Sequence, residues 1–235
     1  MKYLIAIYLW TVGFLYFGII CIIGILLTFI ISQRTLDPWI KKMLRGLFRI
    51  LHTRVLSVGS EKIEQGKTYL FMTNHVSLFD VPLLGAYIPT FVRGVEARQQ
   101  FRWPFYGWAV RRLGNIPIDR ENIHTSIRSI RKSEKLLQSG TSMAIMPEGH
   151  RTLDGKLRPF KKLPFFLAKQ ADVDIVPIGL SGLFHLKRKK SWLIRPTTIK
   201  IKFGDIIPAE KVRSLSVIEL RDHTRREIQK LIEKP

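Results

Sequence analysis

Residues 68–80 read TYLFMTNHVSLFD, an apolar run that leads directly into a polar turn. Residues 68–72 have the length and the aromatic and apolar content of a buried strand. Similar short runs recur at residues 90–93, 142–146, 175–179 and 198–203. Helical patterns lie between them at residues 78–87, 104–113, 123–138 and 160–170, and a last helix is expected from a Ser216 cap to about residue 232. This alternation predicts an α/β domain with a mainly parallel sheet flanked by helices.

The chain upstream of this domain begins with an apolar run longer than a membrane span. Residues 3–31 contain no charged side chain, and about 20 residues suffice to cross a bilayer. A cleaved signal peptide is the alternative, but its apolar region would be only about 7 to 15 residues long. The run therefore predicts a membrane helix, either one long span, which we favour, or a hairpin bent near Gly18 or Gly24. Basic residues cluster after the run rather than before it, so the positive-inside rule places the rest of the chain on the cytoplasmic face.

A second N-terminal helix is predicted at residues 39–51, where apolar and basic residues alternate at helical spacing. The apolar side would consist of Trp39, Ile40, Met43, Leu44, Leu47, Phe48 and Leu51, and the basic side of Lys41, Lys42, Arg45 and Arg49. A helix packed on a protein core would show the same pattern, but a basic side next to a membrane helix favours an amphipathic helix in the lipid interface. We expect an anchor of residues 1–57, with a turn at residues 33–38, followed by the α/β domain at residues 58–235.

Charge and cysteine content narrow the classes of function. The formal net charge of +21 predicts attraction to nucleic acid, an anionic membrane, or an acidic carrier or substrate. The single cysteine, Cys21, lies in the apolar run, which excludes a disulfide framework and a cysteine-based metal cluster. Zinc spacings, a dinucleotide fingerprint, a complete P-loop and a complete nucleophile elbow are also absent from the sequence. We therefore expect no metal and no bound cofactor.

The polar turn after the first strand carries the strongest chemical signal. His75 and Asp80 are five residues apart, at a strand end that opens into a helix, where binding sites in α/β sheets gather. Asp80 can accept a hydrogen bond from one ring nitrogen of His75, which fixes the tautomer. The other ring nitrogen can then accept a proton from a substrate hydroxyl. A histidine near an aspartate also occurs in purely structural roles, so the rest of the chain must decide.

Four short blocks in fixed order give the sequence a resemblance to the lysophosphatidic acid acyltransferase family. The first block is Asn74-His75 followed by Asp80, and the second combines Arg98 with the segments PFYG at 104–107 and GNIPIDR at 114–120. The third block is PEGHRT at 147–152, and the fourth is IVPIG at 175–179. Two positions depart from the family pattern, since His150 replaces the usual threonine and Arg98 the usual lysine. Both substitutions keep a polar hydrogen-bond donor.

This resemblance implies an enzyme that moves a fatty acyl group from acyl-CoA or acyl carrier protein to the sn-2 hydroxyl of lysophosphatidic acid, giving phosphatidic acid. His75 would be the general base and Asp80 its partner. Arginine gives a phosphate bidentate hydrogen bonds, and the resemblance assigns the phosphate of the acceptor to Arg98, Arg120 and Arg151. Glu148 and Gly149 are expected at the same site, with Asn74 and Pro177 supporting it. Solvated surface arginines, and a simple turn at residues 148–149, are the alternatives.

Other functions remain open at this point. The acceptor could be another lysophospholipid, glycerol 3-phosphate or an amino-lipid. A membrane-tethered basic binding module without catalysis would also fit the charge, but it would make the four blocks coincidental. The expected partners are membrane lipids, lysophosphatidic acid and the thioester donor, with no nucleic acid.

Overall fold

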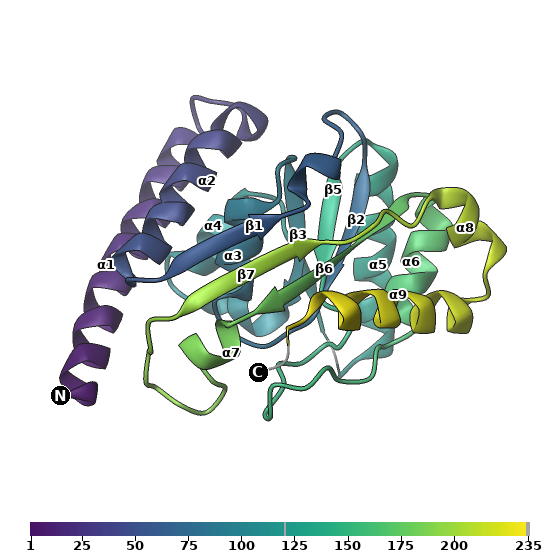
Figure 1. The fold of residues 1–235 in the computed structure, drawn as a ribbon. Helices are drawn as coiled ribbons and strands as arrows, with labels where there is room; N and C mark the ends of the chain where they lie inside the picture. The colour runs from purple at the N-terminus through teal and green to yellow at the C-terminus, as the bar shows by residue number, and fades with distance from the viewer. Residues whose placement is uncertain (120, 234–235) are drawn as a thin grey trace.

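The computed structural model describes residues 1–119 and 121–233, and within these ranges it contains one mixed sheet between two layers of helices (Figure 1). The strand order is β1-β7-β6-β2-β5-β3-β4. The strands are β1 (Arg54–Val58), β2 (Tyr69–Thr73), β3 (Val92–Ala97), β4 (Ile116–Ile118), β5 (Ser142–Ile145), β6 (Asp174–Ser181) and β7 (Thr198–Phe203). From β6 to β4 all neighbours are parallel, whereas β1 and β7 form a parallel pair that joins β6 in antiparallel orientation. The prediction of an α/β domain with a mainly parallel sheet is confirmed.

The helices divide between the two faces of the sheet (Figure 1). They are α1 (Lys2–Leu27), α2 (Gln33–Ile50), α3 (Asp80–Tyr87), α4 (Tyr106–Arg112), α5 (Ile123–Gln138), α6 (Leu163–Ala171), α7 (Leu183–Leu186), α8 (Ala209–Ser214) and α9 (Val217–Leu231), with 3-10 turns η1 (Ser60–Lys62) and η2 (Arg98–Arg102). Helices α5, α6, α8 and α9 pack on one face, and α1, α2 and α3 on the other.

Strand β2 shows why the sheet is buried on both sides. Tyr69 and Phe71 belong to the core beneath α2 and α3, whereas Leu70 and Met72 belong to the core beneath α5 and α6. All four side chains are fully buried. Successive side chains of a strand point to opposite faces, so an unbroken apolar run fits a central parallel strand. Burial of each such side chain contributes roughly 1.5–3 kcal/mol, which fixes the position of the polar turn that follows.

Helix α1 is continuous, as in the favoured interpretation of one long helix, and the alternative of a hairpin bent near Gly18 or Gly24 is wrong. Gly24 serves close packing instead, because a Cβ there would lie 3.2 Å from the side chain of Ile40 on α2. The expected turn at residues 33–38 is also wrong. Ser32 caps α2 by accepting a hydrogen bond from the Thr35 amide, and Pro38 lies inside that helix. By length and composition alone, α1 could cross a membrane.

Helix α2 is amphipathic, but its apolar side faces protein. Leu44, Leu47 and Phe48 are buried against the rest of the chain. Lys41, expected on the exposed basic side, is buried, where its Nζ donates to the Thr90 carbonyl at 2.7 Å and pairs with Asp37. The core-packed alternative therefore describes this side of the helix. The boundary expected at residues 57/58 falls inside β1, which pairs with β7, and the division into anchor and domain remains a prediction.

Candidate active site

The carboxyl ends of the parallel strands meet at one edge of the sheet, and the expected site residues gather there. Asn74 and His75 follow β2, Arg98 follows β3, and residues 148–151 follow β5. Arg120, expected after β4, lies outside the described residues. Because ligands of α/β sheets bind outside the carboxyl ends of the strands, this edge is the candidate active site.

His75 and Asp80 are in direct contact. The ring Nδ1 of His75 lies 2.6 Å from Oδ2 of Asp80, which is fully buried and is the first residue of α3. The same carboxylate accepts the backbone N–H groups of Val76 at 2.8 Å and Ser77 at 3.0 Å. The two N–H donors fix the orientation of the Asp80 carboxylate, and the carboxylate in turn fixes the orientation of the His75 ring. With Nδ1 occupied by this contact, Nε2 is the ring nitrogen that can accept a proton.

Glu148 holds the backbone of the same turn. Its side chain is 3% exposed, and its two oxygens accept the N–H of His75 at 2.6 Å and the N–H of Arg158 at 2.8 Å. Burial raises the pKa of Glu148 to about 7, with a smaller contribution from the charge of Asp80, while the two N–H donors oppose the rise. The carbonyl of His75 in turn accepts the N–H of Thr152 at 2.9 Å. The third block therefore clamps the peptide groups of His75 from both sides.

Asn74 ties the turn to the neighbouring strand. Its side-chain oxygen accepts the N–H of Leu180 at 2.8 Å, and its side-chain nitrogen donates to the Leu180 carbonyl at 3.0 Å. The amide thus extends the pairing between β2 and β6 by one residue. Pro177 lies in β6 beside Met72, and its carbonyl accepts the N–H of Gly204 at 2.8 Å. Pro177 contributes to the sheet beneath the site.

The arginines are distributed unevenly along the edge. Arg151 is half-buried and lies next to Thr152, which contacts His75. Arg98 is 60% exposed and forms an ion pair of 3.6 Å with Asp119. Strand β5 separates β3 from β2, so Arg98 starts about 10 Å from the strand that carries His75. The structure brings His75, Asp80, Glu148 and Arg151 together and leaves Arg98 farther along the same edge. Gly149 adopts φ +75°, and a Cβ there would lie 3.1 Å from Lys161.

An apolar cavity of about 430 Å³ lies under α1, beside the turn of residues 74–80. Leu78 and Phe79, the two residues before Asp80, line it together with Trp10, Phe14 and Phe17 of α1. A further hollow of about 150 Å³ shares Phe17, Cys21, Val81, Pro82 and Tyr106 with it. Sequence reasoning missed this space, because its walls come from α1, from α2 and from segments as far along the chain as residues 103–106 and Ile194.

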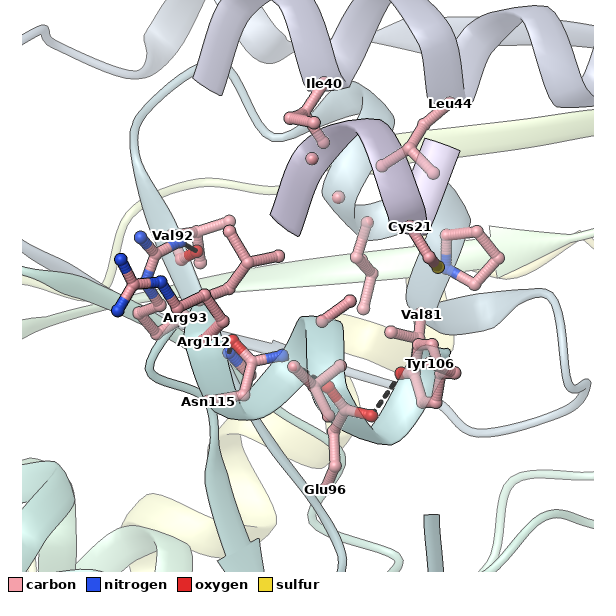
Figure 2. A pocket seen from close by; sticks show the side chains of 18 of the residues that line it. Cys21, Ile40, Leu44, Val81, Val92, Arg93, Glu96, Tyr106, Arg112 and Asn115 are labelled. Atoms are coloured by element: carbon pink, nitrogen blue, oxygen red, sulfur yellow. Dashed lines mark hydrogen bonds between the residues drawn. The ribbon is translucent and has the colours of Figure 1, made fainter. Parts of the chain in front are cut away.

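Figure 2 shows the smaller hollow, whose lining includes the buried carboxylate of Glu96 as well as apolar side chains. Glu96 accepts hydrogen bonds from the Tyr106 hydroxyl and from the Asn115 side chain, the latter at 2.5 Å. Both donors belong to the second sequence block, so this block supplies part of the wall of the smaller hollow. Among the residues that the structure describes, no group of three or more His, Cys, Asp or Glu side chains could hold a metal ion.

Comparison with known proteins identifies the family. The sequence model of the Acyltransferase family matches residues 54–181, from β1 to the end of β6, and so covers all four blocks. The chain belongs to the acyltransferase family. The turn of residues 74–80, the third-block residues that bond it and the link from Asn74 to β6 all lie inside the matched region.

Relatives within the acyltransferase family cover different parts of the chain. A protein of Limnanthes douglasii named 1-acyl-sn-glycerol-3-phosphate acyltransferase is 32% identical over 62% of this chain and 51% of its own length. A Pseudomonas aeruginosa protein named lyso-ornithine lipid O-acyltransferase is 35% identical over 48% of this chain and 42% of its own. The chain thus spans about half the length of these relatives or less.

A solved structure extends the likeness beyond the matched region. The acyltransferase PlsC of Thermotoga maritima, titled a 1-acyl-sn-glycerophosphate acyltransferase, superposes with a TM-score of 0.85 at 22% identity. The superposition covers 97% of this chain and 93% of that one. It shows that the two chains share a fold.

Proposed function

We propose that the protein transfers a fatty acyl group from a thioester to the sn-2 hydroxyl of lysophosphatidic acid, giving phosphatidic acid. The observation that carries this proposal is the buried pair of His75 and Asp80, set beside an apolar cavity under α1. The pair supplies a base of fixed orientation, and the cavity offers space for an acyl chain. The names of relatives within the family support the choice of acceptor.

The proposed reaction needs one base and no covalent enzyme intermediate. Nε2 of His75 takes the proton of the acceptor hydroxyl as its oxygen attacks the thioester carbonyl. The new C–O bond forms, the C–S bond breaks, and the leaving thiolate takes the proton back from the imidazolium. Asp80 stabilises that imidazolium, and backbone N–H groups near the site stabilise the oxyanion. The acceptor phosphate docks on the arginine side of the site, where Arg151 is next to Thr152, whose N–H donates to the His75 carbonyl.

The acyl chain is proposed to lie in the cavity under α1. Trp10 stacks near Phe79 with ring centres 6.2 Å apart, and Phe17 packs near Tyr106 at 5.8 Å. These contacts close the cavity on the side of α1. Leu78 and Phe79 form the part of its wall next to Asp80, which would place the thioester end of a bound chain near His75.

Membrane attachment is proposed to occur in the plane of one leaflet. Near its start α1 contacts Phe79 through Trp10, and just beyond its end the Thr28 carbonyl accepts from Arg112 at 3.0 Å. A helix that crossed the bilayer could not keep both ends against one charged domain. Many large apolar side chains on the outer side of α1 are exposed, among them Leu4, Leu15 and Leu26. In-plane binding would bury this side in lipid and so replaces the single span as our preferred arrangement. Attachment at the cytoplasmic face remains a prediction.

The test uses purified protein in detergent with lysophosphatidic acid and either acyl-CoA or acyl carrier protein, with the lipid product identified by its mass. We expect phosphatidic acid from the wild type and none from His75→Ala. His124→Ala, which removes an exposed histidine on α5, serves as the matched control. Vesicle binding should be the same in all three proteins. Substantial transfer by His75→Ala would refute the assignment of the base, and vesicle binding without any turnover by the wild type would favour the basic binding module.

Transfer to a lyso-amino-lipid is the second candidate function, favoured by the 35% identity to the Pseudomonas aeruginosa relative. Competition between lysophosphatidic acid and lyso-ornithine lipid for the same thioester separates the two. The phosphate-binding proposal requires lysophosphatidic acid to be the preferred acceptor, and a preference for the amino-lipid would contradict it.

A further inference from the structure

Lys187 is a buried cation in the loop that follows β6 and α7, at the same edge of the sheet as His75. The residue is 8% exposed. Its Nζ donates to the carbonyl oxygens of Arg188, at 3.0 Å, and Ser191, and it lies 5.7 Å from the ring centre of Trp10. Within residues 1–119 and 121–233, Lys187 forms no ion pair with an aspartate or glutamate. Carbonyls and an aromatic face offer only partial negative charge, so the positive charge stays uncompensated.

Two hydrogen bonds place the backbone of Lys187 and that of Thr152, the neighbour of Arg151, beside the turn that carries His75. The hydroxyl of Ser77 donates to the carbonyl of Lys187 at 3.0 Å, while the N–H of Ser77 donates to Asp80. On the other side of the turn, the N–H of Thr152 donates to the His75 carbonyl, which brings Arg151 close. Lys187 and Arg151 therefore come from different loops and flank the same residues, 75–77.

The two cations also influence each other electrostatically. Burial lowers the pKa of Lys187, and the charge of Arg151 lowers it further. A buried cation beside a second cation destabilises the folded protein unless an anion joins them. If Lys187 served only to close its loop by hydrogen bonds to two carbonyls, a neutral donor could form those bonds without the free-energy penalty of burying a charge. Among the residues that the structure describes, no aspartate or glutamate forms an ion pair with Lys187 to supply that anion.

We propose that Lys187 and Arg151 together bind the phosphate of the lysophospholipid acceptor. Lys187 lies outside the four sequence blocks and acts as a specificity-determining residue. The inference rests on the proposed function, because that function supplies an acceptor with a phosphate next to its hydroxyl. A phosphate bound by both side chains would lie next to residues 75–77, which would bring the neighbouring hydroxyl to the His75 ring.

The experiment measures kcat and KM for both substrates in wild type, Lys187→Gln, Lys187→Arg and Lys190→Gln. Lys190 is an exposed lysine of the same loop, so its substitution is the matched control for the loss of charge. A lost hydrogen bond between charged groups predicts a rise of roughly 10-fold to 100-fold in the KM for lysophosphatidic acid in Lys187→Gln. We expect the KM for acyl-CoA to stay unchanged, Lys187→Arg to recover most of the affinity, and Lys190→Gln to match the wild type.

A double variant tests whether the two cations share one phosphate. If they do, the effects of Lys187→Gln and Arg151→Gln on the KM for lysophosphatidic acid are not additive. Should the glutamine variant lose its thermal transition, Lys187→Met, which keeps the buried stem, repeats the measurement. An unchanged KM for lysophosphatidic acid in Lys187→Gln, a rise in the KM for acyl-CoA instead, or an equal loss in Lys190→Gln would overturn the inference. Absence of product from the wild type with any lysophospholipid would instead refute the proposed function.

Discussion

Replacing Glu148 by glutamine should change how the stability of the protein depends on pH. The pKa of Glu148 is raised from 4.5 to about 7, chiefly by burial. An acid with a higher pKa in the folded state binds its proton more tightly when folded, so between pH 4.5 and 7 the folded state carries more protons than the unfolded state. The contribution of Glu148 to stability is therefore greatest below pH 4.5 and declines as the pH rises to 7. A shift of about 2.5 pKa units (7 minus 4.5) corresponds to a decline of roughly 3 kcal/mol.

Glutamine cannot ionise, so Glu148→Gln removes this decline. Like the protonated acid, glutamine leaves one of the two N–H groups, of His75 or Arg158, without its acceptor. The assay is urea unfolding in a mild detergent, followed by tryptophan fluorescence at intervals from pH 4 to pH 8. We expect the free energy of unfolding of the wild type, relative to that of the variant, to fall by roughly 3 kcal/mol across this range. Parallel curves would show that burial does not raise the pKa of Glu148 and would refute the reasoning.

Three further outcomes are expected. Asp80→Asn removes the charge that stabilises the imidazolium and should lower kcat by a factor on the order of 10³ or more, with a small change in KM; a loss below tenfold would contradict the role of the pair. Gly18 lines the larger cavity, and a Cβ there meets nothing within 4 Å. A leucine at this position would fill part of the cavity, so Gly18→Leu should shift the preference toward shorter acyl thioesters in a competition assay. An unchanged chain-length profile would place the acyl chain elsewhere. A Cβ on Gly107 would lie 2.3 Å from the Phe101 carbonyl, so Gly107→Ala should destabilise the protein by roughly 1–3 kcal/mol. The measurement is a lower melting temperature than that of Gly18→Ala, whose Cβ has open space.

Elements with a strong local signal were predicted well. Strand β7 and helix α5 have the bounds expected from periodicity, residues 198–203 and 123–138. Helix α9 starts with the expected capping box, in which Ser216 and Glu219 each bond the backbone of the other. These features depend on residues a few positions apart, so the sequence alone can reveal them.

Elements that depend on distant partners were missed or misplaced. Strands β1 and β4 lie at the two edges of the sheet, and each is specified mainly by pairing with β7 or β3. Strand β3 was expected at residues 90–93 but runs over Val92–Ala97. The buried Glu96 hid its second half, because the donors that satisfy this carboxylate, Tyr106 and Asn115, are 10 and 19 residues away.

In the candidate site too, contacts between residues close in sequence could be predicted, and contacts between distant residues could not. The contact between His75 and Asp80 follows from a spacing of five residues and could be expected. The bond from the His75 amide to Glu148 spans 73 residues and depends on β2 and β5 being neighbours, which no spacing reveals. Lys187 could not be distinguished from the other basic residues, because the sequence contains 39 lysines and arginines and burial is not visible in it.

The packing of α1 against the cavity has a practical consequence for anyone who wishes to obtain a water-soluble version of this enzyme. Deleting the first helix would remove the most apolar segment of the chain. It would also open the cavity proposed for the acyl chain and expose Phe79, Leu47 and Leu51 to solvent. Solubility and turnover are therefore coupled through one piece of chain. Polar replacements confined to the outward side of that helix, at positions such as Leu4 and Leu15, offer a way to improve the first without sacrificing the second.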